Sequence, residues 1–338
     1  MKKLLCLLTI LLLSALHAQS VLPVIPQANA ILVLNVVALK GTLLTNMLPQ
    51  TLAFLAQKQQ ASGDSSRAKY IDTLQKFAAS QDQDEALPLQ QMAISFALQE
   101  NPKESQALCF CTFGKPVSKD QLLATLNQQE DLKIEVKDTP QGVRLDFIPK
   151  DQEAPTFCCL LTPEAKSLFA GTPAAVETAS TAATTTALPE LLNAYKLLPK
   201  GAPIRLALLF PTGQQSPFAK VIADRGLADT PIGLAMQSAT GIAISMGSDA
   251  NEFGYRQLLI FPTPEAAQQC KDVVLDGMVL GLGKMSVEQT LGHSIPLLDS
   301  MATDVHDNAA EFTCRCTAAD LEALRPLFEA ASAQEPQY

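Results

Sequence analysis

The feature that most constrains this chain is an internal similarity between its two halves. Several blocks of the first half have counterparts in the second half, in the same order along the chain. The aligned blocks are 22–36 with 198–210, 93–98 with 243–248, 107–126 with 255–274, and 134–147 with 285–298. Repeats of this length are typical of two copies of one domain, because solenoid units span only roughly 20 to 50 residues. We therefore predict a tandem duplication.

Strands and helices are predicted in both halves. Apolar runs and their periodicity predict strands at 30–39, 92–98, 107–113, 133–137, 143–148, 156–161 and 167–170, and helices near 43 and 65 and over 117–129, 189–198 and 318–330. Ser118 is typical of a helix N-cap, and "PQG" at Pro140–Gly142 is typical of a hairpin turn. Hairpins with helices packed on them indicate an α+β fold with mainly antiparallel sheets.

The predicted organisation has four parts. Residues 1–18 form a signal peptide, 19–176 the first α+β repeat, 177–196 a linker or helix, and 197–338 the second α+β repeat. The stretch Glu177–Glu190 is rich in Ser, Thr and Ala, which is typical of a linker or a weak helix.

The first 18 residues have the layout of a secretory signal. Lys2 and Lys3 precede the apolar run Leu4–Leu13, and small residues lead to a cleavage position after Ala18. The run is shorter than the roughly 20 residues that span a bilayer. We expect a periplasmic or extracellular protein with no membrane span after cleavage; a retained anchor is the alternative.

Charge and composition argue against several classes of partner. Without Lys2 and Lys3 the chain keeps 23 basic against 34 acidic residues, a net charge of about −11. Nucleic acid and anionic membrane surfaces need clustered Lys and Arg, so neither is expected. The chain has no Trp and only 4 Tyr, which disfavours a carbohydrate groove with aromatic platforms.

The cysteines follow the pattern of buried apolar residues. In the alignment of the halves, Cys111 corresponds to Leu259 and Cys270 to Leu122. A cysteine that exchanges with leucine behaves as a small buried hydrophobe, and no C-x₂-C pair of a zinc site is present. We therefore expect no metal and no cofactor, and we predict that the thiols fill the core.

Disulfide bonds remain an open alternative for an exported chain. Seven cysteines follow residue 18, which is an odd number, so at least one thiol stays free or pairs between chains. A bond from Cys111 to Cys158 or Cys159 is geometrically possible if the two strands adjoin.

One motif suggests a hydrolase. "GDSS" at Gly63–Ser66 is similar to the serine block of one esterase family, which would imply Ser65 or Ser66 as nucleophile with His306 as partner. The motif follows a polar helix tail rather than a buried strand, and Asp304 lies too close to His306 for the usual Asp-x-x-His. A loop ending in a helix cap is the favoured interpretation.

Two further stretches resemble binding loops. "GMVLGLGKM" (Gly277–Met285) departs from the phosphate loop G-x-x-x-x-G-K-[ST] in spacing and in its last residue, so a helix end with glycine caps is predicted. "DSMATDVHDN" (Asp299–Asn308) lacks the Gly and terminal Glu of a calcium loop and is predicted to be a solvated acidic loop. His293 and His306 are both placed in loops.

The opening "LPVIPQANAILVLNV" (Leu22–Val36) and the two degenerate copies resemble a broad group of exported bacterial proteins, largely uncharacterised. The resemblance implies a fold and a location but no activity. We expect a non-catalytic envelope or periplasmic binding protein whose partner is a protein or an apolar ligand held between the copies. A serine hydrolase using Ser65 or Ser66 with His306, and an extracellular effector or inhibitor, are the alternatives. No catalytic, cofactor or metal residue is assigned.

Overall fold

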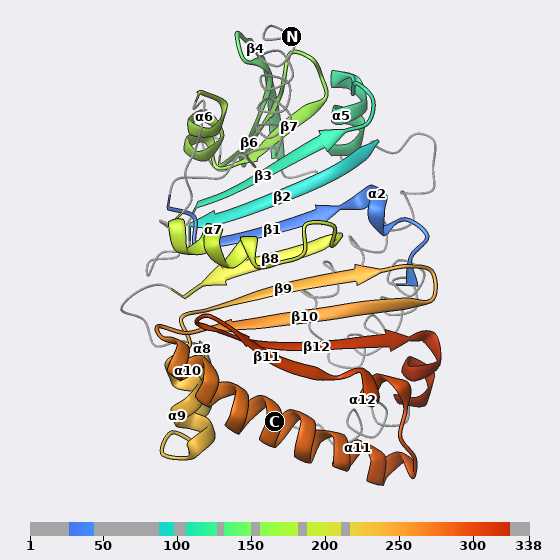
Figure 1. Cartoon of the computed structure of the whole chain (residues 1–338). Helices are drawn as coiled ribbons and strands as arrows, with labels where there is room; N and C mark the ends of the chain where they lie inside the picture. The colour runs from blue at the N-terminus through green and yellow to red at the C-terminus, as the bar shows by residue number, and fades with distance from the viewer. Residues whose placement is uncertain are drawn as a thin grey trace, which may run out of the picture.

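The computed structural model describes residues 27–43, 88–97, 106–126, 132–149, 156–181, 188–210 and 217–324. These residues form a 12-stranded sheet in which the strands follow the order β11-β12-β10-β9-β8-β1-β2-β3-β7-β6-β5-β4 (Figure 1). Each neighbouring pair is antiparallel. The predicted α+β class with a mainly antiparallel sheet is therefore confirmed.

The strands and helices have the following bounds. The strands are β1 Ala30–Asn35, β2 Leu89–Ala97, β3 Gln106–Phe113, β4 Leu132–Thr139, β5 Gly142–Pro149, β6 Phe157–Leu161, β7 Ser167–Gly171, β8 Ile204–Leu209, β9 Gly241–Ser248, β10 Glu252–Ile260, β11 Ala302–His306 and β12 Ala309–Thr317. The helices are α2 Val36–Leu39, α5 Lys119–Leu126, α6 Pro173–Thr181, α7 Pro189–Lys196, α8 Pro217–Asp224, α9 Pro231–Gln237, α10 Pro264–Cys270, the π-helix η1 Lys271–Gly283, α11 Lys284–Leu291 and α12 Pro296–Ser300. Residues 318–324 are also helical.

The two halves of the chain meet where β1 pairs with β8. Val33 lies opposite Arg205 in this pair. Outward from it the order is β2, β3, β7, β6, β5 and β4 on one side, and β9, β10, β12 and β11 on the other. Strands from 19–176 and from 197–338 thus share a single sheet, and the duplication itself stays a prediction.

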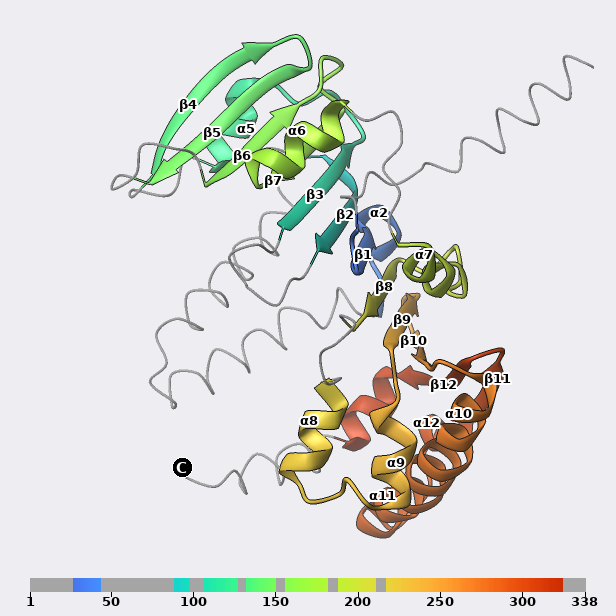
Figure 2. The ribbon, with the colours of Figure 1, turned by 90° about the vertical axis from the view of Figure 1, so that its left-hand side faces the viewer.

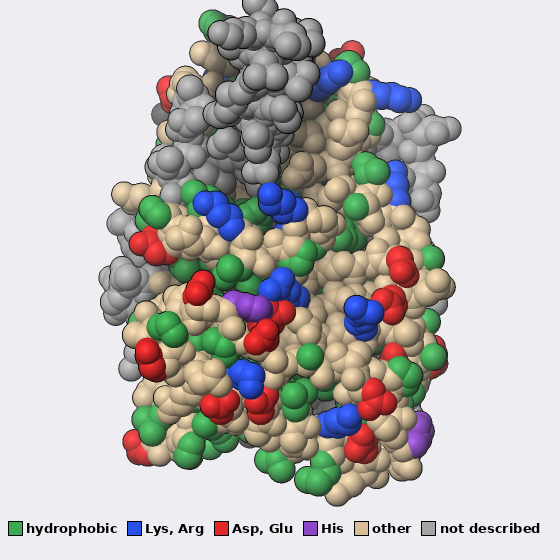
Figure 3. Space-filling model, viewed as in Figure 1, with side chains coloured by type: hydrophobic (Ala, Val, Ile, Leu, Met, Phe, Trp, Pro, Cys, Tyr) green, Lys and Arg blue, Asp and Glu red, His purple; other side chains and the backbone are tan. Residues whose placement is uncertain are grey.

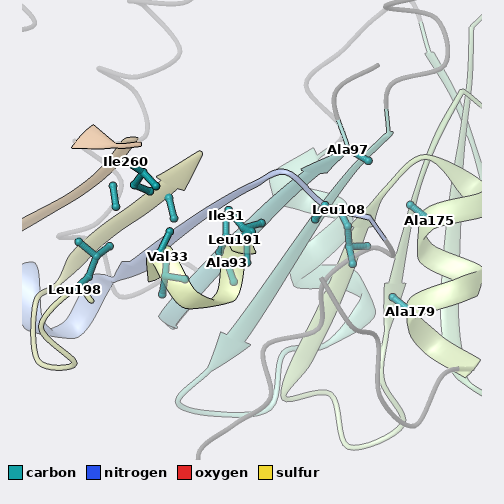
Figure 4. Packing of buried hydrophobic residues seen from close by; sticks show 14 of the residues in the cluster. Ile31, Val33, Ala93, Ala97, Leu108, Ala175, Ala179, Leu191, Leu198 and Ile260 are labelled. Atoms are coloured by element: carbon teal, nitrogen blue, oxygen red, sulfur yellow. The ribbon is translucent and has the colours of Figure 1, made fainter. Parts of the chain in front are cut away.

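One face of the sheet, here called the α7 face, packs against α6 and α7. Because successive side chains of a strand alternate between faces, Ile31 and Val33 lie on this face, in one core cluster with Leu191 of α7. Figure 4 shows Leu191 close to Ile31, with Ala175 of α6 directed toward the sheet. Full burial of a side chain such as Ile31, 1% exposed, contributes about 1.5–3 kcal/mol.

The opposite face carries two separate clusters. Near α5, Val117 and Leu122 pack on Phe113, Leu145 and Cys159. At the other end of the sheet, side chains of α9, α10 and η1 pack on β10 and β12, and the buried members are Ala235, Ala239, Leu259, Phe261, Ala267, Cys270, Val274, Leu275 and Ala310. Figure 2 shows α7 and α8 on opposite sides of the sheet, and β4–β7 turned out of the plane of the central strands.

Local signals in the first half predict its elements well. Ser118 and Gln121 form a reciprocal cap of α5, because the Gln121 N–H donates to Ser118 Oγ at 3.1 Å and the Ser118 N–H donates to Gln121 Oε1 at 2.9 Å. The hairpin at Pro140–Gly142 joins β4 to β5 as predicted, with Gly142 at a φ of 130°. The hairpin of β6 and β7 and helix α7 are confirmed as well.

The first strand is shorter than predicted. It ends at Asn35 rather than at residue 39, because the Asn35 side chain accepts a hydrogen bond from the Ala38 N–H at 3.0 Å and caps the short helix α2. The predicted helix near residue 43 begins at the limit of the described residues. The one predicted near 65 lies outside them, as does the signal segment 1–18.

Three predictions for the second half are wrong. Residues 285–298 do not match 134–147 in structure, since the first segment is helical in α11 and α12 and the second is the β4–β5 hairpin. Gly277–Met285 is not a helix end, because η1 continues directly into α11 and the left-handed cap comes only at Gly292. Asp299–Asn308 is not a free acidic loop, because β11 occupies half of it and pairs with β12.

Candidate functional site

A row of polar residues crosses the α7 face in the second half. The strand register places Arg205 of β8 opposite Ser245 of β9, Ser245 opposite Arg256 of β10, and Arg256 opposite Thr313 of β12. Two residues further along β8, on the same face, the buried Ala207 lies opposite the buried Ala243. Two arginines therefore lie on a face that also carries the apolar core packed against α6 and α7.

A groove of about 750 Å³ opens over this row. Its walls come from the turn between α7 and β8 on one side and from the α12–β11 region on the other. The lining residues are Pro199, Gly201, Ala202, Ser245, Gly247, Gly254, Tyr255, Arg256, Ser300, Ala302, Thr313, Cys314 and Arg315. The volume lies within the range of small-molecule sites, roughly 300–1,000 Å³.

Two facing glycines form part of the floor of the groove and leave it without side chains at that point. Gly247 of β9 lies opposite Gly254 of β10. A Cβ atom built at either position would meet no heavy atom within 4 Å, so both glycines face open space. Glycine in a strand interior weakens the strand and marks positions where another molecule can approach the backbone closely.

Three buried polar atoms of the α7 face lack a hydrogen-bond partner, and one of them belongs to Arg256, which lines the groove. They are Arg205 Nε, Arg256 Nε and the Tyr195 hydroxyl, and among the described residues only Thr172 Oγ1 shares this condition. The Arg205 guanidinium lies 4.8 Å from the centre of the Tyr195 ring. Burial raises the pKa of Tyr195 to about 12, against the opposing effect of the Arg205 charge. The phenol therefore remains a neutral hydrogen-bond donor.

A carboxylate at the side of the groove holds one of the arginines. Glu311 of β12, whose side chain is 10% exposed, accepts from Arg256 Nη2 at 2.7 Å. The same carboxylate lies 2.5 Å from His306 Nε2, and Asp304 lies 3.7 Å from that ring nitrogen. His306 thus lies on β11 rather than in a loop and is engaged by Glu311.

A second buried carboxylate occupies the α7 face of the first half. Asp146 of β5 accepts from Arg144 Nε at 2.7 Å and from Lys137 Nζ at 2.8 Å, and its side chain is 3% exposed. Burial by itself would raise the pKa of Asp146, but the hydrogen bonds from Lys137 and Arg144 outweigh it and hold this pKa below its ordinary value. Figure 3 shows basic and acidic side chains interspersed on the visible part of this side of the molecule.

The nucleophiles of the predicted hydrolase are not covered by the described part of the chain. Ser65 and Ser66 lie outside the described residues. His293 follows α11, is exposed, and its Nδ1 lies 3.0 Å from the carbonyl oxygen of Leu291. His306 contacts two carboxylates, and no hydroxyl or thiol of the described residues is hydrogen-bonded to its ring. The described part of the chain therefore shows a charge cluster around His306 and no nucleophile beside it.

Four of the seven thiols in the described ranges lie in the core, as predicted, and Cys109, Cys111 and Cys314 are partly exposed. Cys158, Cys159, Cys270 and Cys316 are buried in the core, and burial raises the pKa of Cys159 and Cys270 to about 12. All seven cysteines within the described ranges are free. The possible bond from Cys111 to Cys158 or Cys159 does not fit, because β7 lies between β3 and β6.

One pair of thiols departs from simple space filling. Cys109 and Cys111 of β3 share the opposite face, and their sulfurs are 3.6 Å apart. The hydrogen bond with Cys111 lowers the pKa of the Cys109 thiol against the effect of burial, while the same contact and burial raise the pKa of Cys111. The pair therefore has one thiol that ionises more readily than its neighbour.

The two arginines of the polar row were missed by the sequence reasoning, although a signal was available. Arg205 stands inside the apolar run "IRLALL" and Arg256 inside "YRQLLI", each on the face that the strand pattern assigns to the core. A charged residue at an inward position needs a partner or a function.

Two searches over the described ranges are negative. No group of three or more His, Cys, Asp or Glu side chains is placed to hold a metal ion within those ranges. No helix there combines the length and the apolar character needed to cross a membrane.

Comparison with known proteins gives a distant structural likeness. No family model and no curated protein matches the chain. Among solved structures, crystal form III of TP0453 has a TM-score of 0.45 at 8% identity, covering 92% of this chain and 96% of that one. Crystal form IV gives a TM-score of 0.43 at 9% identity, covering 90% and 94%, and crystal form I gives 0.42 at 9%, covering 90% and 96%. We draw no functional argument from similarity at this level.

Proposed function

We propose that this protein is a non-catalytic binding protein of the periplasm or extracellular space, and that a ligand or partner segment occupies the groove on the α7 face. The observation that carries the proposal is the open glycine floor. Gly247 and Gly254 face each other in the register, and neither would meet another atom if it carried a side chain. A strand without a function at this point would gain stability from a β-branched residue.

The export signal and the repeated order of elements support this assignment. A signal-like segment at 1–18 motivates the location. The corresponding strand orders on the two sides of the β1–β8 pair support descent from a duplicated domain. In this interpretation the second copy developed the groove, while the insertion of the β4–β5 hairpin extended the sheet of the first copy.

The test compares a filled groove with an unchanged one. Gly254→Val adds a β-branched side chain in open space, so the variant should fold and the groove should be obstructed. Thr112→Val, on the same face of β3 in the other half, is the matched control. Each protein is purified from its source and examined by native mass spectrometry. We expect a bound mass in the wild type and in Thr112→Val that is absent from Gly254→Val; the same bound species in all three proteins would contradict the assignment.

The serine hydrolase is a second candidate because His306 lies against a carboxylate. Glu311 contacts the ring at 2.5 Å, as a catalytic histidine would require of its orienting partner. The wild-type chain and the double variant Ser65→Ala/Ser66→Ala are compared on a chromogenic short-chain ester. Ester cleavage that is lost in the double variant would favour the hydrolase over the binding protein. An effector or inhibitor role would instead show as capture of one defined host or competitor protein in a pulldown.

A further inference from the structure

We propose that this protein forms a homodimer in which β4 of one copy pairs antiparallel with β4 of a second copy, with Ile134 on the two-fold axis. The partner subunit is therefore another molecule of the same chain, and the two sheets become one continuous sheet across the axis. This inference is independent of the groove, which lies among the strands of the second half.

The outer edge of β4 offers backbone hydrogen-bonding groups to another strand. β4 is the last strand of the sheet, and within the described ranges no strand pairs with its outer side (Figure 2). Thr139 and Gly142 face each other across a two-residue turn, and residues in that position exchange both of their hydrogen bonds. The alternation along the ladder then directs the N–H and C=O groups of Leu132, Ile134 and Val136 away from β5. Such an edge is a template for pairing with another chain.

The charged side chains of β4 favour one register of this pairing. Lys133, Glu135 and Lys137 alternate along one face of the strand. With Ile134 on the axis, each Lys133 stands opposite Glu135 of the partner subunit, which gives two reciprocal pairs of opposite charge. A register centred on Glu135 would instead place glutamate against glutamate and lysine against lysine, which is destabilising. Lysine often protects a sheet edge, but its alternation with glutamate makes this edge complementary to itself.

An apolar row on the other face of the hairpin ends at the same residue. Ile134 lies opposite Phe147 of β5, and Phe147 lies opposite Phe157 of β6. The centroids of the two phenylalanine rings are 5.6 Å apart. Phe157 is 41% exposed, and Val136 beside this row is 37% exposed. With Ile134 on the axis, the rows of the two copies join into one, whereas a register centred on Val136 would set Asp138 against Ile134.

The contacts around Glu135 leave a place for a cation from the partner subunit. Glu135 lies directly opposite the like-charged Asp146, to which Lys137 and Arg144 are bound. Lys133 contacts Glu135 from the same strand and is 67% exposed, so its ammonium group can reorient toward the partner without a cost of burial. The interface is small, with about six backbone hydrogen bonds between the two strands, and we therefore expect a reversible dimer.

Sedimentation velocity of the full chain over a range of concentrations measures this equilibrium. We expect the wild type to dimerise as its concentration rises. Val136→Pro removes an N–H group that points away from β5, which is the kind of position where an edge strand accepts proline. This variant should keep the circular dichroism spectrum of the wild type and remain monomeric. Val136→Thr keeps the N–H group and the β-branched shape, and as the matched control it should dimerise like the wild type.

Charge reversal tests the register. Lys133→Glu and Glu135→Lys should each weaken dimerisation at least about tenfold, because each places like charges opposite one another. The double variant exchanges the two charges and should restore the dimer. In a register centred on Val136 the lysine introduced at 135 would face Lys137, and the dimer would not recover. Lys200→Glu makes the same change of charge at an exposed turn before β8 and should leave the dimer unchanged.

Three results would overturn the inference. They are a wild-type chain that stays monomeric at every concentration, a folded Val136→Pro variant that still dimerises, and a double charge variant that does not recover. Should Val136→Pro fail to fold, the charge variants decide the question, because Lys133 is 67% exposed and its replacement leaves the core intact. Gly254→Val should not affect the dimer, so the groove and the β4 interface are tested separately.

Discussion

Replacing Asp146 measures how much a buried ion cluster contributes to the free energy of unfolding of this sheet. Its carboxylate accepts hydrogen bonds from Arg144 and Lys137 at 2.7 Å and 2.8 Å while its own side chain is almost fully buried. Asp146→Asn keeps the shape of the side chain and removes the charge. Arg144, with a side chain 25% exposed, would then lose its charged partner on the α7 face.

The magnitude follows from the two contacts and their exposure. Hydrogen bonds to a charged group contribute about 1.5–3 kcal/mol each when they are shielded from water. The Lys137 side chain is 53% exposed, so its contact with Asp146 contributes much less to stability. The asparagine of the variant still offers Arg144 a neutral hydrogen-bond acceptor. We therefore expect Asp146→Asn to lower the free energy of unfolding at pH 7 by about 1–3 kcal/mol.

The pKa of Asp146 determines how the stability difference between the wild type and Asp146→Asn changes with pH. The pKa of Asp146 is lower in the folded chain than in the unfolded one, so the carboxylate contributes stability above the unfolded pKa of about 3.9, and this contribution is lost as the pH falls through the folded pKa. Urea unfolding of wild type and variant between pH 7 and pH 3, followed by circular dichroism, should show a constant difference above about pH 5 that shrinks below about pH 4.

Glu135→Gln is the control for this experiment. Glu135 also contacts Lys137, at 3.3 Å, but it is far more exposed than Asp146. Its replacement should change stability less than Asp146→Asn at every pH. An Asp146→Asn difference that stayed the same from pH 7 to pH 3, or an equal effect of both variants, would refute the argument that burial gives this cluster its strength.

Three further outcomes are expected. Ser118→Ala removes one half of the reciprocal cap of α5 and should destabilise the chain by about 1 kcal/mol in urea unfolding. Gly142→Ala should cost at least about 1 kcal/mol, because its φ is 130° and a Cβ atom would lie 2.0 Å from the Leu161 carbonyl oxygen. An aromatic disulfide reagent should form a mixed disulfide at Cys109, which the neighbouring Cys111 thiol then resolves as it gives its proton to solvent, so that two reagent thiols are released and the peptide becomes lighter by two hydrogens in mass spectrometry.

Matched controls accompany the last two outcomes. Gly254→Ala, at an open position with an ordinary φ, should leave stability within about 0.5 kcal/mol of the wild type. Cys314 and Cys316 have the same spacing on β12, but the Cys316 thiol donates to the Thr317 carbonyl at 3.6 Å. A disulfide that formed at Cys314–Cys316 and not at Cys109–Cys111 would contradict the sulfur geometry, and a tolerated Gly142→Ala would contradict the backbone argument.

Local chemistry explains which elements could be predicted from the sequence. Ser118 with Gln121, and the turn at Pro140–Gly142, fix their elements through contacts between near neighbours in the chain. Such signals act before any tertiary packing and can be recognised from residue types alone. The α+β class follows because the hairpins and the helices were each identified in this way.

The remaining features depend on contacts between distant parts of the chain. Gly277–Met285 contains glycines that suggest a helix end, yet packing of the buried Val274 and Leu275 just before it accompanies a π-helix that runs through it. His306 was assigned to a loop because the pairing of β11 with β12 is not visible in its neighbours. The groove combines residues of β9, β10 and β12 with the turn that precedes β8, and only the sheet register brings those strands side by side.

The central position of β1 has a consequence for the order in which the chain can fold. Its hydrogen bonds on one side go to β2, at most about 70 residues later, but those on the other side wait for β8, which begins at Ile204. During synthesis the nascent N-terminal half therefore presents an unpaired strand rich in apolar residues, the kind of edge that recruits other polypeptides. A fragment that stops before residue 204 should self-associate, whereas a chain extended through β8 can pair that strand with its own β1. A chaperone that binds the exposed edge of β1 would therefore be needed only until β8 has been synthesised.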